Sequence, residues 1–172
     1  EARKIAASAS VPTIPGSDGA VSEFKKALEI AESIGFPLLI KASAGGGGRG
    51  MRVVESRDTL EQDLNEIMSE AEVAFGDSSV YIEKYLTDIR HIEVQLLADG
   101  DSCIHLGERD CTAQRRNQKL VEEAPSPALS NSQRNDLCQS AVRLATKVKY
   151  KSAGTVEYVY DNIDKQFYFI EM

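Results

Sequence analysis

The chain has 172 residues, of which 42% are hydrophobic and 27% are charged, and its formal net charge is −7. This length suits one domain or two small ones, and the composition is that of an ordinary globular protein. The acidic balance argues against a nucleic-acid or membrane-surface binder, and no apolar segment reaches membrane-spanning length. The three cysteines include no C-x-x-C pair, which favours reduced thiols in a cytoplasmic or mitochondrial-matrix compartment and argues against zinc.

The chain begins with elements typical of an α+β unit. Residues 1–15 combine the end of a helix with a proline-punctuated linker. Apolar residues at helical spacing then predict a helix that begins at Val21 and ends at Gly35. Two short strands, P-L-L-I-K-A-S and M-R-V-V-E-S, follow on either side of a glycine-rich loop.

A second helix is expected next, with Asp58 and Glu61 as a capping box and Gly76 at its end. The segment V-Y-I-E-K-Y-L predicts a third strand. Residues 16–86 are therefore expected to form one compact unit.

From residue 89 the pattern becomes strand-rich. A strand with alternating apolar and polar residues leads through a D-G-D-S turn into a returning strand. An irregular segment, residues 109–129, precedes a helix that Ser130 and Gln133 cap. Two final strands predict an antiparallel sheet over residues 87–172. The end in mid-strand suggests a piece of a longer protein.

The most informative segment is the loop K-A-S-A-G-G-G-G-R-G, which begins at Lys41. Four consecutive glycines are costly to order, so their use indicates a backbone that must approach a ligand closely. Phosphate is the usual ligand, with Lys41 and Arg49 supplying charge. Because a strand rather than a helix follows, we expect a glycine flap over a nucleotide, not a P-loop. The alternative is a mobile surface loop.

Glu157 and Glu171 lie among aromatic and β-branched residues in the last two strands. If Asp161 pairs with Phe167, the two glutamates lie directly opposite each other. Opposed carboxylates destabilise a sheet unless a cation joins them, and Mg²⁺ takes one or two carboxylates together with nucleotide phosphates. In the alternative, a register shifted by one residue places them on opposite faces.

Three other polar segments have two interpretations each. In E-R-D-C-T-A-Q-R-R-N-Q-K-L-V-E-E-A-P, interleaved charges suggest a loop that presents one lysine to a small anion, or a solvated connector. His91 and Gln95 share the polar face of a strand that either lines a site or faces solvent. Y-I-E-K-Y-L either holds an adenine through its backbone or carries a surface ion pair. The chain has no nucleophilic triad, glycosidase carboxylate pair or dinucleotide fingerprint, which leaves phosphate chemistry.

Taken in order, these motifs together with R-H-I-E-V-Q, A-G-T-V-E-Y and F-Y-F-I-E-M resemble the biotin carboxylase component of biotin-dependent carboxylases, such as acetyl-CoA carboxylase. The resemblance extends from about residue 11 to the last residue. It implies an ATP-grasp fold, with residues 16–86 as the ATP lid and residues 87–172 as the first part of the C-terminal lobe. It also implies activation of bicarbonate by ATP to carboxyphosphate and carboxylation of biotin on a carrier protein, with a carboxyltransferase as a further partner.

The resemblance also implies roles for individual residues. The expected phosphate contacts are Lys41, Gly47 and Gly48, and the adenine contacts, largely through backbone, are Glu83, Lys84, Tyr85 and Leu86. His91 is expected to be a further nucleotide contact. The expected bicarbonate ligand is Lys119, and the expected Mg²⁺ or Mn²⁺ ligands are Glu157 and Glu171. Asn117 takes the position of a histidine that contacts the ribose in some members.

The family's N-x-R-x-Q-V-E-H run, which carries the catalytic Arg and Glu, does not follow F-I-E-M here. We therefore expect this chain to be inactive alone. The alternatives are a nucleotide-binding or folding module without activity, and another ATP-grasp ligase such as the carbamoyl-phosphate synthase type. The segment A-Q-R-R-N-Q-K favours biotin carboxylase. The final carboxyl acceptor is not specified.

Overall fold

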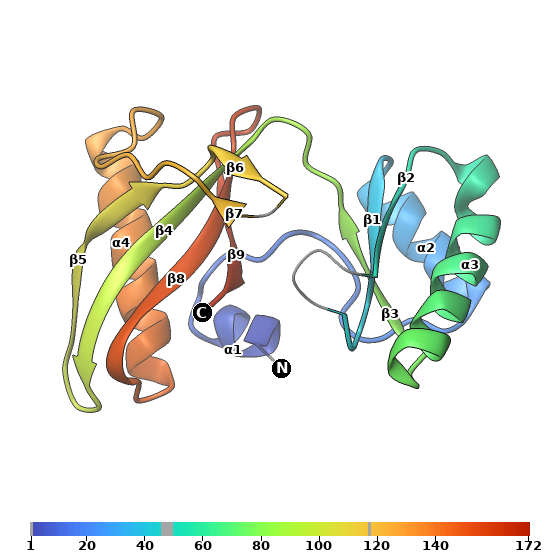
Figure 1. The fold of residues 1–172 in the computed structure, drawn as a ribbon, viewed down its shortest axis with the longest axis horizontal. Coiled ribbons are helices and arrows are strands. Elements are labelled where there is room, and N and C mark those ends of the chain that lie inside the picture. Colours follow the sequence, from blue (N-terminus) through green and yellow to red (C-terminus); the bar gives the residue numbers. More distant parts are fainter. Residues whose placement is uncertain (1, 46–49, 117) are drawn as a thin grey trace. The chain divides into compact units, whose positions relative to one another are not determined.

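The computed structural model describes residues 2–45, 50–116 and 118–172. These residues divide into two compact units (Figure 1). The small unit comprises Ile14–Leu86, and the large unit combines the chain up to Thr13 with Thr87–Met172. Among the described helices, none is long and apolar enough to cross a membrane. Each unit is described by itself below.

The small unit is a three-stranded antiparallel sheet with two helices on one face (Figure 1). Its elements are α2 (Phe24–Ile34), β1 (Leu38–Ala42), β2 (Met51–Val54), α3 (Arg57–Phe75) and β3 (Val80–Lys84), with the strands in the order β2-β1-β3. The core lies between helices and sheet, where Leu38, Ile40 and Ile82 of the strands pack with Leu64 and Ile67 of α3. Alternate residues of β1 are buried, as expected for a strand with one face covered.

Two details of the small unit differ from the sequence predictions. Helix α2 begins at Phe24 rather than Val21, because Val21 pairs with Val80 as an extension of the sheet. The predicted capping box of Asp58 and Glu61 is wrong. Ser56 is the N-cap of α3 and makes no side-chain capping bond, so Asp58 lies inside the first turn, where the helix dipole favours a negative charge.

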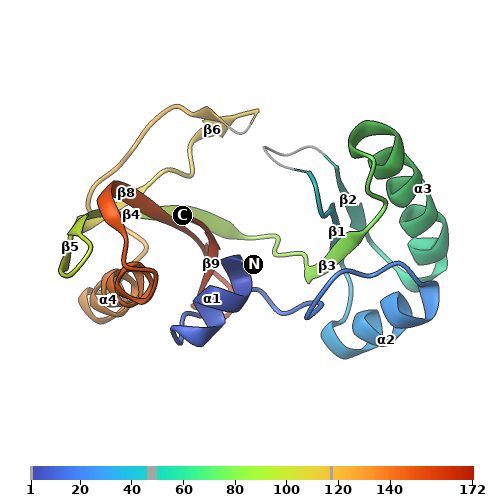
Figure 2. The same ribbon diagram turned by 90° about the horizontal axis from the view of Figure 1, so that it is seen from below.

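The large unit is a four-stranded antiparallel sheet in the order β5-β4-β8-β9. Its elements are α1 (Ala2–Ser8), β4 (Ile89–Asp99), β5 (Cys103–Asp110), β6 (Gln114–Arg115), β7 (Gln118–Lys119), α4 (Asn131–Lys147), β8 (Lys151–Asp161) and β9 (Phe167–Glu171). Figure 2 shows α4 below the sheet and the β6–β7 hairpin on the opposite side.

Successive side chains of β4 point to opposite faces of the sheet, and this decides which of them lie on the side of the β6–β7 hairpin. Ile92, Val94 and Leu96 are fully buried in the core with α4, as the sequence pattern predicted. His91, Glu93 and Gln95 therefore point to the other face. The predicted capping box at the start of α4 is confirmed, since Ser130 and Gln133 bond each other's backbone N–H groups.

The closing hairpin reaches the predicted pairing of Glu157 with Glu171 by another route. Phe167 pairs with Tyr160, so the predicted pairing with Asp161 is wrong by one residue. The register then shifts between Tyr158 and Glu157, which places Glu157 opposite Glu171. Such a bulge adds one residue to a strand and re-aims the side chains beyond it. The metal-ligand role expected for the two glutamates is a separate question.

Candidate functional site

A row of charged residues crosses all four strands of the β5-β4-β8-β9 sheet. Arg109 of β5 pairs with Glu93 of β4, Glu93 pairs with Glu157 of β8, and Glu157 pairs with Glu171 of β9. Three successive carboxylates next to one guanidinium would repel each other strongly. We call these four residues the charged row.

Lys119, at the end of the β6–β7 hairpin, supplies a second cation to this row. Its ammonium group donates to Glu157 Oε1 at 2.6 Å and also to Glu93 Oε2. Glu93 is 3% exposed and also accepts hydrogen bonds from Arg109. The described cations thus balance Glu93 fully, whereas the Glu157–Glu171 end of the row retains an excess of negative charge.

The hydrogen bonds keep these groups ionised. Burial of the Lys119 ammonium works to lower its pKa, but hydrogen bonds to Glu157 and Glu93 outweigh burial and raise the pKa above its usual value. Burial of Glu93 works to raise its carboxyl pKa, yet Lys119 and Arg109 lower that pKa below its usual value. Lys119 is therefore a permanent cation near neutral pH rather than a proton acceptor.

His91 is also part of this site. Its Nε2 lies 2.7 Å from Glu157 Oε2, and its Nδ1 lies 3.0 Å from the side-chain nitrogen of Gln114. Since the amide of Gln114 donates to Nδ1, Nε2 carries the proton and donates to Glu157. The alternative interpretation, that this face of β4 only meets solvent, is therefore wrong for His91, which orients a carboxylate.

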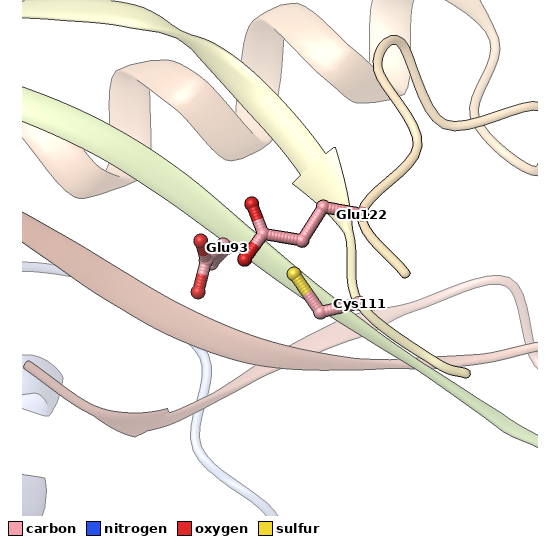
Figure 3. A group of neighbouring side chains, drawn as sticks. All are labelled: Glu93, Cys111 and Glu122. Carbon is pink, nitrogen blue, oxygen red and sulfur yellow. The ribbon is translucent and has the colours of Figure 1, made fainter. Parts of the chain in front are cut away.

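Glu93, Cys111 and Glu122 form a group whose potential ligand atoms lie within 4.8 Å of one another (Figure 3). Glu93 is already paired with Lys119 and Arg109, and Glu122 lies 3.1 Å from Arg109. Burial, followed by the charge of Glu93, raises the pKa of the Cys111 thiol to about 11. A protonated thiol beside two cations is a poor metal ligand. The two carboxylates of this group therefore serve as partners of Arg109 and Lys119 and not as metal ligands.

In the small unit, Lys41 Nζ lies 2.5 Å from Glu83 Oε2, which links the end of β1 to β3. The glycine loop returns to β2 at Gly50, whose φ of +67° favours glycine. A Cβ atom at Gly50 would lie 2.8 Å from the Cβ of Ala42, so the two sides of the loop approach closely there. The predicted site residues Gly47, Gly48 and Asn117, together with Arg49, lie outside the described residues.

The segment from Glu83 to Leu86 is tied to the rest of the small unit. Lys84 Nζ donates to the carbonyls of Phe36 at 2.8 Å and Gly35 at 3.3 Å, at the end of α2. The backbone N–H groups of Lys84 and Tyr85 donate to Pro15 and Pro37. The alternative interpretation, a surface ion pair between Glu83 and Lys84, is therefore wrong, because the two side chains have different partners.

Sequence reasoning missed Glu93, Arg109 and Gln114. Each residue lies within a segment that the sequence analysis described, but its amino-acid type alone does not indicate a functional role. Glu93 becomes recognisable only once β4 is paired with β8, which places it beside Glu157.

Comparisons with known proteins identify the family of this chain. The family model of the carbamoyl-phosphate synthase L chain ATP-binding domain matches residues 1–172. Biotin carboxylase 1 of Bacillus subtilis is 48% identical over 172 residues, and a pyruvate carboxylase subunit from Methanothermobacter thermautotrophicus is 51% identical over 171. The alignments cover 99% of this chain but only 38% and 34% of these relatives, so the chain spans little more than a third of their length.

Two solved structures have the same fold. A biotin carboxylase–β,γ-ATP complex from Campylobacter jejuni matches with a TM-score of 0.91 and 48% identity, over 99% of this chain and 38% of that one. The biotin carboxylase domain of Hydrogenobacter thermophilus 2-oxoglutarate carboxylase, in complex with MgADP, ADP and bicarbonate, matches with a TM-score of 0.89 and 46% identity, with the same coverage. The chain therefore belongs to the carbamoyl-phosphate synthase L chain ATP-binding domain family, as an α+β ATP-grasp domain of the biotin carboxylase and pyruvate carboxylase type.

Proposed function

We propose that this chain is the ATP- and bicarbonate-binding part of an enzyme that carboxylates biotin on a carrier protein. The observation that carries the proposal is the charged row with Lys119 above it. The row joins a permanent cation, suited to a small anion, to a carboxylate pair suited to a divalent cation. Bicarbonate and a metal-bound nucleotide are the two ligands that this combination fits.

Lys119 is proposed to bind bicarbonate. Two of the three N–H groups of its ammonium serve Glu93 and Glu157, which hold the nitrogen in place, and the third is the donor proposed for the anion. Since its pKa is raised, the charge persists while bicarbonate attacks the γ-phosphorus of ATP and ADP leaves. Lys119 thus stabilises negative charge and does not transfer a proton.

Glu157 and Glu171 are proposed to hold Mg²⁺ or Mn²⁺, and the residues fit such an ion. Hard divalent cations prefer carboxylate oxygens, and this end of the row carries surplus negative charge. Although the Glu157 oxygens accept from Lys119 and His91, each oxygen has a second lone pair. When bound, the metal ion neutralises charge on the nucleotide phosphates.

The small unit is proposed to bind the nucleotide. Lys41 and the glycine loop, including Gly47 and Gly48, would contact the phosphates, and Asn117 and His91 of the large unit would add nucleotide contacts. The adenine contact is proposed for the backbone of Glu83, Lys84, Tyr85 and Leu86, other than the N–H groups of Lys84 and Tyr85, which are bonded within the unit. The MgADP and bicarbonate in the Hydrogenobacter thermophilus complex support this set of ligands.

A chimeric enzyme tests the proposal. Residues 1–172 would replace the matching segment of Bacillus subtilis biotin carboxylase 1, and bicarbonate-dependent ATP hydrolysis would be measured. We expect activity, and a rise in the KM for bicarbonate of at least about tenfold with Lys119→Gln, from the loss of one charged hydrogen bond. Lys151→Gln, at an exposed position of β8, is the control. An unchanged KM in Lys119→Gln would contradict the proposal.

Calorimetry on the 172-residue chain tests nucleotide binding separately. We expect weak binding of Mg-ADP that Glu171→Gln reduces and that the exposed control Asp136→Asn leaves unchanged. Binding that ignores Glu171→Gln would place the nucleotide elsewhere. Absence of heat from folded protein would favour the alternative of a folding or interaction module. We do not expect the chain alone to carboxylate free biotin.

A further inference from the structure

We infer that Asp110 is a positioning residue for Lys119, because its carboxylate and backbone hold together both ends of the loop between β5 and α4. We call residues 111–126 the lysine loop, since it carries Lys119 and the β6–β7 hairpin. The inference rests on the proposed function, in which Lys119 binds bicarbonate. Neither the family match nor the sequence motifs assign a role to Asp110.

The first end of the lysine loop is held at Thr112. Asp110 Oδ1 accepts hydrogen bonds from the Thr112 backbone N–H at 3.1 Å and from its hydroxyl at 2.5 Å. The same hydroxyl accepts from the backbone N–H of His91 at 3.0 Å, and the N–H of Cys111 donates to the carbonyl of His91 at 2.7 Å. The start of the loop is thereby joined to β4 beside His91.

The second end is held at Glu123 and Ser126. The backbone groups of Asp110 and Glu123 exchange two hydrogen bonds, at 2.8 and 3.0 Å. Asp110 Oδ2 accepts from the Ser126 hydroxyl at 3.0 Å and from Arg90 at 3.0 Å. One residue of β5 therefore contacts the chain both before and after the hairpin that presents Lys119.

Hydrogen bonds rather than close packing set the spacing of the two ends. A hollow of about 300 Å³ is lined by Thr112 and Ala113 from the first end, by Val121 and Glu123 from the second, and by Arg90 and Asp110. The pairing of β6 with β7 and the Leu120 N–H bond to the Ala113 carbonyl hold the hairpin together, so the bonds of Asp110 act on the base of the hairpin. The position of Lys119 over Glu93 and Glu157 thus depends on Asp110 in addition to the bonds of Lys119 itself.

Only an ionised carboxylate satisfies this arrangement. Asp110 is 4% exposed and its oxygens accept four hydrogen bonds. Burial works to raise its pKa, but the donors from Thr112, Ser126 and Arg90 outweigh burial and lower it. An asparagine would turn an N–H₂ group toward donors on one side, so Asp110→Asn loses side-chain bonds at one or both ends of the loop while the backbone bonds remain.

Hydrogen exchange in the 172-residue chain tests the structural half of the inference. With Asp110→Asn we expect the amides of residues 112–116 and 118–121 to exchange at least about tenfold faster, because a lost charged hydrogen bond lowers the cost of local opening. Asp161→Asn is the matched control, since Asp161 is also buried in the large unit but accepts from Ile163 in another turn. If Asp110→Asn fails to fold, Ser126→Ala removes one donor and should accelerate the same amides about threefold.

Kinetics of the chimeric enzyme test the functional half. Asp110→Asn should raise the KM for bicarbonate about tenfold and the KM for ATP by less, because the lysine loop carries the proposed bicarbonate ligand but only Asn117 among the proposed nucleotide contacts; general destabilisation would not give this split. Unchanged exchange over residues 112–116 and 118–121 would show that Asp110 does not hold the ends of the lysine loop. Faster exchange with an unchanged KM for bicarbonate would show that the loop does not position Lys119. If Lys119→Gln itself left that KM unchanged, the proposed function would fail, while the exchange result would still decide whether Asp110 holds the ends of the lysine loop.

Discussion

The two units use charge in different ways. In the small unit, Arg52 of β2 reaches Asp63, Glu66 and Glu70 along α3, and the Glu66 and Glu70 side chains are 44% and 63% exposed. In the large unit, Arg109 and Lys119 share Glu93, whose side chain is 4% exposed. The ion pairs of Arg52 lie on the surface of a fold that an apolar core already stabilises. The second set, the ion pairs of Glu93, joins the four-stranded sheet to the β6–β7 hairpin and is part of the candidate site.

This difference indicates how much each set contributes to stability. Exposed ion pairs gain little because water screens them, whereas a buried charge that loses its partner keeps its full desolvation cost. The large unit should therefore depend on its charges for both folding and ligand binding. Apart from the Lys41–Glu83 pair, in which the glutamate is buried, the small unit should depend mainly on its core.

The largest effect is expected from Glu93→Gln. The substitution leaves Lys119 and Arg109 without their common buried partner and should lower the free energy of unfolding by about 4 kcal/mol. Urea denaturation of the 172-residue chain measures it. Glu122→Gln is the control, because Glu122 also pairs with Arg109 but is exposed. Equal effects of the two substitutions would contradict the distinction between buried and exposed charge.

Ile82→Ala should have the next largest effect, and it should be confined to the small unit. Ile82 is fully buried in the core of that unit, so the cavity should cost about 3 kcal/mol. Hydrogen exchange should accelerate across β1 and β3 but not across β4 and β8. Equal acceleration in both units would mean that they unfold together, and the comparison of separate units would break down.

Acid should weaken the large unit through Glu93 and Asp110. Both carboxyls have a lowered pKa in the folded protein, so they take up protons more readily when the chain is unfolded. Their stabilisation is present above the unfolded-state pKa of about 4 and is lost as pH falls through the lower folded-state value. Urea midpoints between about pH 6 and pH 3 should fall, and Glu93→Gln should make that fall shallower. An identical pH profile in the variant would show that Glu93 does not contribute to the loss of stability in acid.

Arg52→Gln should have the smallest effect, below about 1 kcal/mol, because its partners lie on the exposed side of α3. The loss should shrink at high salt, which screens exposed ion pairs. Urea denaturation at low and high salt measures both effects, with Arg57→Gln as the control for a more exposed pair with Glu32. A loss as large as that of Glu93→Gln would mean that the small unit also depends on its charges.

Local sequence signals were sufficient to predict most elements and the faces that they bury. The period-2 pattern of β4, the Ser130–Gln133 capping box and the glycine at the end of α3 are such signals, and each has its predicted outcome. The family motifs also identified Lys119, Glu157 and Glu171 as candidates. These features depend on neighbours a few residues away, which a single sequence displays directly.

How the candidate residues meet depends instead on strand pairing. Glu93 and Glu157 are 64 positions apart, and their pairing follows from the register of β4 with β8. The bulge before Glu171 and the hold of Asp110 on both ends of the lysine loop depend equally on distant partners. Register is selected by how whole strands pack against α4 and each other, and no local propensity contains that information. The residue types of the site can therefore be read from the sequence, but their arrangement follows only from the folded sheet.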